Sequence, residues 1–157
     1  MRVDDGLRAL LRRRLPPPGQ FTTVETGGRG DDGVPDCYWI GCGIGVWIEC
    51  KSARRGRAVS FRPGQLGWLL TYCRHGGRAV VAVRRRLIRD PGVDELHLLA
   101  GADAEKLGSL GLPLAPWDDP PARQGVRRLA PAPRPLGQWR GGPARWDWDE
   151  IRTALLT

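Results

Sequence analysis

The chain has 157 residues and a mass of 17.3 kDa, which is typical of a single domain. Its 41% hydrophobic residues suit a globular protein, and no apolar run reaches the ~18 residues that a membrane-spanning helix needs. The first residues carry acid early and lack an apolar signal sequence. Composition therefore excludes membrane and secreted disulfide classes and predicts a soluble, cytoplasmic protein, and the net charge of +8 predicts an anionic partner.

The first half of the sequence predicts one helix followed by three strands. Leucines at helical spacing predict a helix over 4–15, which ends at a run of three prolines. Residues 20–25 are rich in β-forming side chains and predict a strand, and the glycine-rich residues 26–33 predict a loop. Two further strands, over 34–40 and 44–51, are expected to form a hairpin.

A second helix and a fourth strand complete a core of order αβββαβ. Pro63 suits the first position of a helix that ends at Gly76, and residues 78–83 predict the strand. Trp68 and Tyr72 fall outside the leucine stripe of this helix, where they are expected to seal an interface or pack against the C-terminal segment rather than stack on a base. The core-facing stripe is expected to consist of Leu66, Leu69, Leu70 and Cys73.

The patterns are weaker after Arg89. The expected elements are a strand over 95–99, a short helix over 102–110, an irregular Pro/Gly-rich segment over 111–145 and a closing helix over 146–156. The sequence therefore predicts an α/β fold with a mixed central sheet flanked by helices. Residues 1–90 are expected to form its core, and residues 91–157 a C-terminal extension that packs on the core and is not an independent domain.

Basic residues gather in the middle of the chain. From Cys50 to Arg89 there is no Asp or Glu, while Lys51 and ten arginines fall in this segment. Such a block of one sign is typical of proteins that bind the phosphate backbone of nucleic acids. The side chains expected to contact DNA are Arg29, Arg54, Arg55, Arg57 and Arg62.

The four cysteines do not match a zinc motif. Their spacing contains no Cys-x-x-Cys pair, as a zinc ribbon or knuckle would need, so no zinc is expected. Buried, reduced thiols are predicted instead. The prediction is clearest for Cys37 and Cys50, which lie in apolar, strand-like runs.

Three polar residues in the predicted hairpin indicate chemistry. Glu49 and Lys51 are expected on one face of their strand, with Ile48 and Cys50 on the other, because side chains alternate. Charges among such apolar neighbours are costly unless they are paired or bind a metal. Asp36, on the neighbouring strand, brings a second carboxylate to the same edge. Two carboxylates suit Mg²⁺, for which Mn²⁺ is expected to substitute, and a lysine beside the ion can orient a water or stabilise charge on a phosphate.

Pro35-Asp36 followed by Glu49-x-Lys51, with Gln65 on the next helix, resembles the signature of the PD-(D/E)XK nucleases. The resemblance covers roughly residues 4–89 and is strongest to small phage and archaeal members, either Holliday-junction-resolvase-like or VRR-NUC-like. It implies a restriction-endonuclease-like core and a Mg²⁺-dependent DNA endonuclease that hydrolyses phosphodiester bonds. Double-stranded or branched DNA is the implied substrate, in junction resolution, repair or phage DNA processing.

The resemblance also implies roles for individual positions. Asp36 and Glu49 would ligate the metal together with the backbone carbonyl of Cys50. Lys51 would be the catalytic lysine, and Gln65 the helix glutamine near the site. Many members carry a further acidic residue on the first helix. The candidates for it in this chain, between which the sequence does not choose, are Asp4, Asp5 and Glu25.

Other interpretations stay open at the level of the sequence. Glu49 and Lys51 can form a solvated pair at a sheet edge, and Gln65 can be an ordinary exposed residue. The fold can also serve as a catalytically silent module that binds DNA or protein. A homodimer is a candidate assembly, because a two-fold pair of sites is needed to cut paired strands at a junction. No motif surrounds His97.

Overall fold

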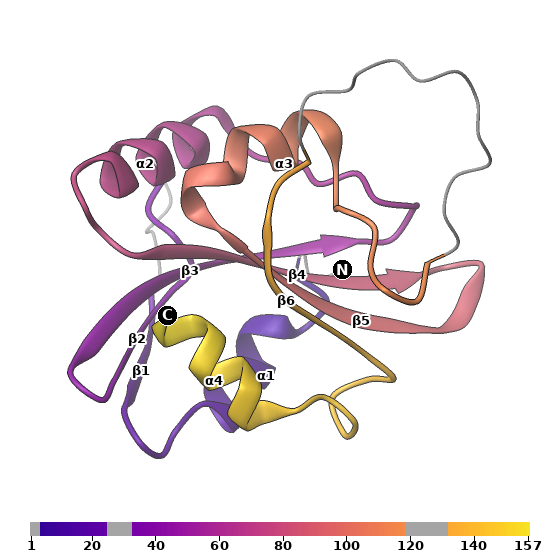
Figure 1. Cartoon of the computed structure of the whole chain (residues 1–157), viewed down its shortest axis with the longest axis horizontal. Helices are drawn as coiled ribbons and strands as arrows, with labels where there is room; N and C mark the ends of the chain where they lie inside the picture. Colours follow the sequence, from indigo (N-terminus) through magenta and orange to yellow (C-terminus); the bar gives the residue numbers. More distant parts are fainter. Residues whose placement is uncertain (1–3, 25–32, 119–131) are drawn as a thin grey trace.

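The computed structural model describes residues 4–24, 33–118 and 132–157. They form a six-stranded mixed sheet with helices on both faces (Figure 1), which confirms the predicted α/β class. The strands are β1 (Gln20–Thr23), β2 (Cys37–Gly41), β3 (Ile44–Ala53), β4 (Ala79–Leu87), β5 (Asp90–Ala100) and β6 (Pro135–Arg140). The helices are α1 (Leu7–Arg14), α2 (Pro63–Arg74), the 3-10 turn Gly101–Asp103, α3 (Ala104–Leu110) and α4 (Trp148–Leu156).

The strands lie in the sheet in their order along the chain. β1, β2 and β3 form an antiparallel meander, and Cys42 and Gly43 make the turn between β2 and β3 with positive φ angles of 51° and 76°. Such a two-residue turn matches the twist of the strands that it joins. β4 runs parallel to β3 because the chain returns through α2, and β5 and β6 continue antiparallel. The predicted order αβββαβ therefore holds from α1 to β4.

The C-terminal part of the chain differs from the prediction. Residues Pro135–Arg140, predicted to be irregular, form β6 at the edge of the sheet and pair with β5. An edge strand tolerates proline, because the backbone groups on its outer side have no partner strand to bond. β4 and β5 are also longer than the predicted strands 78–83 and 95–99, since they pair with each other up to the turn between them. Residues beyond 90 thus contribute two of the six strands.

Helices α1 and α4 lie on one face of the sheet, and α2 and α3 lie on the other (Figure 1). On the face of α1 and α4, the buried side chains include Leu7, Leu10, Leu11, Ile48, Cys50, Ile151 and Leu155. On the face of α2 and α3, they include Leu69, Val81, Val83, Leu99 and Leu107. Glu49 and Lys51 alternate with Ile48 and Cys50 along β3, as predicted, and this alternation places them on the face of α2.

The buried face of α2 differs from the predicted leucine stripe. Gln65 and Leu69 are its buried residues, while the other three members of the stripe are only half-buried. Trp68 and Tyr72 share this face: Trp68 meets Trp47 of β3 edge-on, with ring centroids 5.4 Å apart, and stacks on Tyr72 at 4.7 Å. The helix is rotated relative to the prediction because Gln65 bonds to polar groups on the sheet, which a hydrophobic pattern does not register.

Tryptophans hold the C-terminal helix against the rest of the protein. Trp139 and Trp146 are buried in the core on the α1 and α4 face, and Trp148 packs against it. The indole of Trp139 donates a hydrogen bond to Glu150, and Asp147 caps α4 by accepting from two backbone N–H groups. Over the described ranges, no helix is long and apolar enough to cross a membrane.

The cysteines divide between the core and the surface. Cys37 and Cys50 are buried as free thiols, with their Sγ atoms 3.8 Å apart, as predicted. Cys42 is exposed because it lies in the β2–β3 turn, so the prediction of a buried thiol is wrong there. Cys73 is half-buried on α2.

Candidate active site

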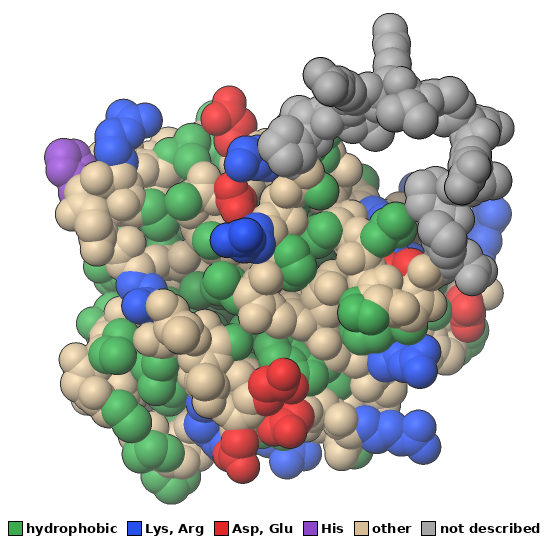
Figure 2. Space-filling model, viewed as in Figure 1, with side chains coloured by type: hydrophobic (Ala, Val, Ile, Leu, Met, Phe, Trp, Pro, Cys, Tyr) green, Lys and Arg blue, Asp and Glu red, His purple; other side chains and the backbone are tan. Residues whose placement is uncertain are grey.

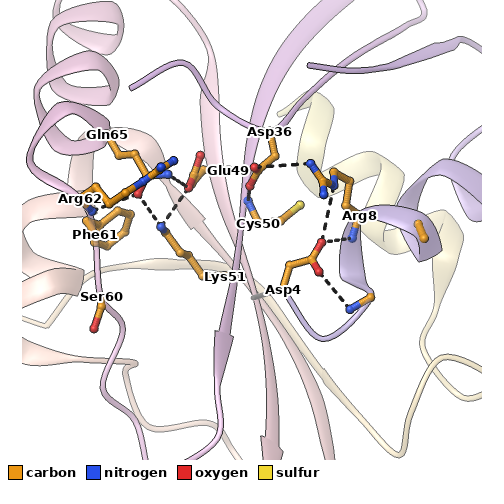
Figure 3. A pocket seen from close by; sticks show the side chains of 12 residues that line it. Asp4, Arg8, Asp36, Glu49, Cys50, Lys51, Ser60, Phe61, Arg62 and Gln65 are labelled. Atoms are coloured by element: carbon orange, nitrogen blue, oxygen red, sulfur yellow. Dashed lines mark hydrogen bonds and ion pairs between the residues drawn. The ribbon is translucent and has the colours of Figure 1, made fainter. Parts of the chain in front are cut away.

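A cavity of about 690 Å³ lies between α1, the start of β2, the middle of β3 and the N-terminal end of α2. Figure 3 shows the polar side chains that line it, with Glu49, Lys51 and Gln65 on one side and Asp4, Arg8 and Asp36 on the other. The three residues of the predicted motif therefore share one cavity with the predicted glutamine. They are up to 29 residues apart in the chain.

Glu49, Lys51 and Gln65 form a closed ring of polar contacts. The Lys51 ammonium lies 3.0 Å from Glu49 Oε1 and donates to Gln65 Oε1 at 2.6 Å. Gln65 Nε2 donates to the same oxygen of Glu49. Gln65 Oε1 also accepts from the backbone N–H of Arg62 at 3.1 Å, which caps the start of α2. The position of the lysine is thus fixed by a side chain that is itself fixed by the helix start.

Asp36 is tied to the strand that carries the other two motif residues. It lies directly before β2, and its Oδ2 accepts a hydrogen bond of 2.9 Å from the backbone N–H of Cys50. Its backbone carbonyl accepts from Val24, so the chain on both sides of β2 holds it in place. Its side chain is 30% exposed, while Glu49 is 1% exposed. One carboxylate therefore faces the solvent side of the cavity and the other is enclosed.

The buried carboxyl of Glu49 has an unusual environment. Burial raises its pKa to about 7, the charge of Asp36 acts in the same direction, and Lys51 opposes both. Among the described residues, Glu49 Oε2 is buried and has no hydrogen-bond partner. A divalent cation bound to this oxygen would give it a partner and would favour the charged form of Glu49.

Asp4 and Arg8 of the N-terminal segment form the opposite wall. Asp4 accepts from the backbone N–H groups of Gly6 and Arg8, each at 3.1 Å, and so caps the first turn of α1. The Arg8 guanidinium lies 3.8 Å from Asp4 Oδ2 and 4.0 Å from Asp36 Oδ1. Arg8 was not among the predicted site residues, although its spacing of four residues from Asp4 on a helix was a usable signal.

The structure separates the candidates for the extra acidic residue. Asp4 lines the cavity, whereas the Asp5 side chain turns to Arg54. Glu25 and the predicted DNA contact Arg29 lie outside the described residues.

The other arginines predicted to contact DNA differ in their surroundings. Arg54 forms an ion pair with Asp5, and Arg57 pairs with Asp118 and donates to the carbonyl of Pro113 at 2.7 Å. Arg55 is exposed, and Arg62 lies at the rim of the cavity.

Part of the one-signed charge block is balanced by acids from other parts of the chain. Besides Arg54 and Arg57, Arg84 and Arg85 of β4 form ion pairs with two carboxylates of β5. Figure 2 shows the result on the face of the molecule seen in Figure 1, where basic and acidic side chains are interspersed. An arginine of this segment is therefore not necessarily available to bind a phosphate.

A second buried polar cluster lies on β5, away from the cavity. His97 is fully buried and contacts Glu95 at 2.9 Å and Gln138 of β6 at 3.1 Å. Glu95 also accepts from the Trp117 indole and from Arg85. These bonds fasten the segment after α3 to the sheet, and no pattern in the sequence predicted them.

The cavity gathers the carboxylates, the lysine and the glutamine that the sequence singles out for phosphodiester chemistry. Comparisons of the chain with protein-family models and with curated proteins find no match in either.

Proposed function

We propose that the protein is a Mg²⁺-dependent DNA endonuclease with a PD-(D/E)XK, restriction-endonuclease-like core. The observation that carries this proposal is the convergence of Asp36, Glu49 and Lys51 on one cavity, with Gln65 bonded to two of them. The element order from α1 to β4 agrees with that core. A solvated pair at a sheet edge is not favoured, because the side chains of Glu49 and Lys51 are only 1% and 11% exposed.

The donor set fits a hard divalent cation. Asp36 and Glu49 would hold it with the backbone carbonyl of Cys50, and the unpartnered Oε2 of Glu49 is an open ligand atom. When bound, the ion would polarise a phosphate oxygen and lower the pKa of a bound water. Carboxylate and carbonyl oxygens suit Mg²⁺ or Mn²⁺ rather than zinc.

The residues of the chain supply the rest of the chemistry. Lys51 presents an ammonium group, which stabilises negative charge that develops on the phosphoryl oxygens during hydrolysis. Gln65 and Glu49 restrict the position of its Nζ atom, and the Phe61 ring lies 4.9 Å from it. An ammonium held in this way is preorganised, so little reorganisation is needed when the substrate reacts.

The proposed substrate is DNA, on account of the positive net charge and the resemblance of the motif. Branched DNA is the first structure to examine, and a homodimer would place two sites for paired cuts.

Cleavage assays with matched lysine variants test the proposal. Plasmid, single-stranded and four-way-junction DNA are incubated with the wild type and Mg²⁺, with EDTA as the metal-free control. Lys51→Ala and Glu49→Ala are expected to lose cleavage by at least about 100-fold while they retain DNA in a gel shift. Lys106→Ala removes the only other lysine, which is exposed on α3, and is expected to cleave normally.

Three results would contradict the proposal. These are full activity in Lys51→Ala or Glu49→Ala, equal activity in EDTA, and absence of cleavage by the wild type on all three substrates. DNA binding without cleavage would favour the catalytically silent module.

A further inference from the structure

The candidate active site adjoins a second cavity across helix α1. This second cavity has a volume of about 510 Å³, and Gly6 and Ala9 line both cavities. Gly6, directly before α1, and Ala9 in its first turn are both small, so only a low ridge, here called the saddle, separates the two cavities. The second cavity is also lined by Arg13 and Arg14 of α1, by Arg84 of β4, by Pro143 and Ala144 of the segment before α4, and by Asp5, whose charge is paired with Arg54.

The arginines around this second cavity are not equivalent. Arg84 is held by two hydrogen bonds to Asp94, and the Arg14 guanidinium lies over the Trp148 ring. Arg13 is exposed, and neither it nor Arg12 forms an ion pair with a residue of the described ranges. Arg13 is therefore a cation on the cavity wall that stays available to an external anion, unlike Arg54, Arg57 and Arg84.

Arg8 extends the same positive surface into the candidate active site. Its side chain is 43% exposed, and its contacts with Asp4 and Asp36 are at 3.8 and 4.0 Å, at the outer limit of an ion pair. Arg8 and Arg13 are five residues apart on α1 and therefore point to different sides of the helix, Arg8 toward the candidate active site and Arg13 toward the second cavity.

We propose that the nucleic acid backbone crosses α1 at Gly6 and Ala9, with one phosphate in the active site beside Arg8 and a flanking phosphate bound by Arg13 in the second cavity. This inference rests on the proposed function for the identity of the ligand. It assigns backbone contact to α1, for which the leucine spacing predicts only a helix. The competing explanation is that basic residues in the last turn of α1 only stabilise the helix dipole.

Binding measurements on arginine variants test this assignment. Anisotropy of a fluorescent DNA duplex is titrated with protein in EDTA at several salt concentrations, so that cleavage does not enter. Loss of one phosphate contact is expected to lower the slope of log K against log salt by about 0.9 and to weaken binding about fivefold at 0.15 M salt. Arg13→Ala is expected to show this loss, and Arg13→Gln the same.

Arg12→Ala is the matched control. Arg12 is the neighbouring exposed arginine in the same turn, and it lines neither cavity. It is expected to keep the wild-type slope. Ala9→Gln fills the saddle without a change in charge and is expected to weaken binding as well, because the side chain obstructs the path between the cavities.

The outcomes separate this inference from the proposed function. An unchanged slope in Arg13→Ala, an equal loss in Arg12→Ala, or no DNA binding by the wild type would overturn the assignment of α1. A wild type that cleaves DNA while Arg13→Ala binds normally would overturn the inference alone. If the wild type never cleaves DNA but Arg13→Ala still lowers the slope, the result would support the binding surface on α1 and contradict the nuclease proposal.

Discussion

The folding stability of Glu49→Gln tests the electrostatics of the candidate active site without an activity assay. The pKa of Glu49 is raised by burial from 4.5 in the unfolded chain to about 7 in the folded protein. Between these values, the unfolded chain has released a proton that the folded protein still holds. Stability therefore falls as the pH rises through this window, because the group must ionise in a buried position.

The size of the effect follows from the two pKa values. Between pH 5 and pH 8, ionisation of Glu49 is expected to lower the free energy of unfolding by about 2.5 kcal/mol. Glutamine has the shape of the protonated side chain and keeps an acceptor for Lys51 and Gln65, so the variant lacks this contribution. We expect Glu49→Gln to resemble the wild type at pH 5 and to be more stable by about 2 kcal/mol at pH 8.

Urea denaturation in EDTA at pH 5, 6, 7 and 8 measures the effect. The difference between the two proteins removes contributions that they share, such as those of the histidines. Glu95 adds nothing in this range: burial raises its pKa, but bonds from His97, Trp117 and Arg85 bring it down to about 2, and its stabilisation is lost only at lower pH. Parallel pH curves for the variant and the wild type would refute the reasoning.

Magnesium provides the second half of the same experiment. A cation at Glu49 favours the charged form, so Mg²⁺ at ten times its Kd is expected to stabilise the wild type at pH 8 by about 1.4 kcal/mol. Glu49→Gln removes a ligand and is expected to show little of this stabilisation. The affinity for Mg²⁺ should also rise as the pH increases through about 7, because the carboxyl must release its proton to bind. Equal stabilisation of both proteins would place the ion elsewhere.

Three other variants test the framework that positions the site. Gly33→Ala is expected to lose about 2 kcal/mol of stability or more, because Gly33 has a φ of 69° and a Cβ there would collide with the backbone of Gly64 in α2; chemical denaturation would show it, and wild-type stability would contradict the close approach. Leu69→Ala is expected to lower stability by about 3 kcal/mol, since the Leu69 side chain is fully buried between α2 and the sheet. A loss of stability below about 1 kcal/mol would indicate that the core is not packed as described. Asp147→Ala removes the cap of α4 and is expected to lower stability by about 1 kcal/mol in thermal unfolding, whereas Asp149→Ala, which leaves that cap in place, should cost less.

Several elements could be predicted because their signals are local. Alternation along β3 places Glu49 and Lys51 on one face, and Pro63 marks the start of α2. The β2–β3 hairpin follows from a short turn between two apolar runs. These features depend on residues that lie within a few positions of one another, so the sequence shows them directly.

Other features depend on partners that are far away in the sequence. β6 contains proline and glycine and becomes a strand only because β5 offers it an edge to pair with. The face that α2 buries is set by Gln65, whose partners are 14 and 16 residues away. A hydrophobic pattern records neither kind of contact, because both depend on hydrogen bonds between separate elements of the fold.

The sequence by itself determined which residue types meet at the candidate site: Asp36, Glu49 and Lys51 follow from the motif and from the alternation of strand side chains. Only the tertiary structure decided which arginines keep an open charge. Electrostatic pairing acts through space, and acids from other segments, such as Asp5 and Asp118, neutralise arginines of a segment that has no acid of its own. A net charge can be counted along a chain, whereas the fold alone decides which charges are paired and which stay open to a ligand.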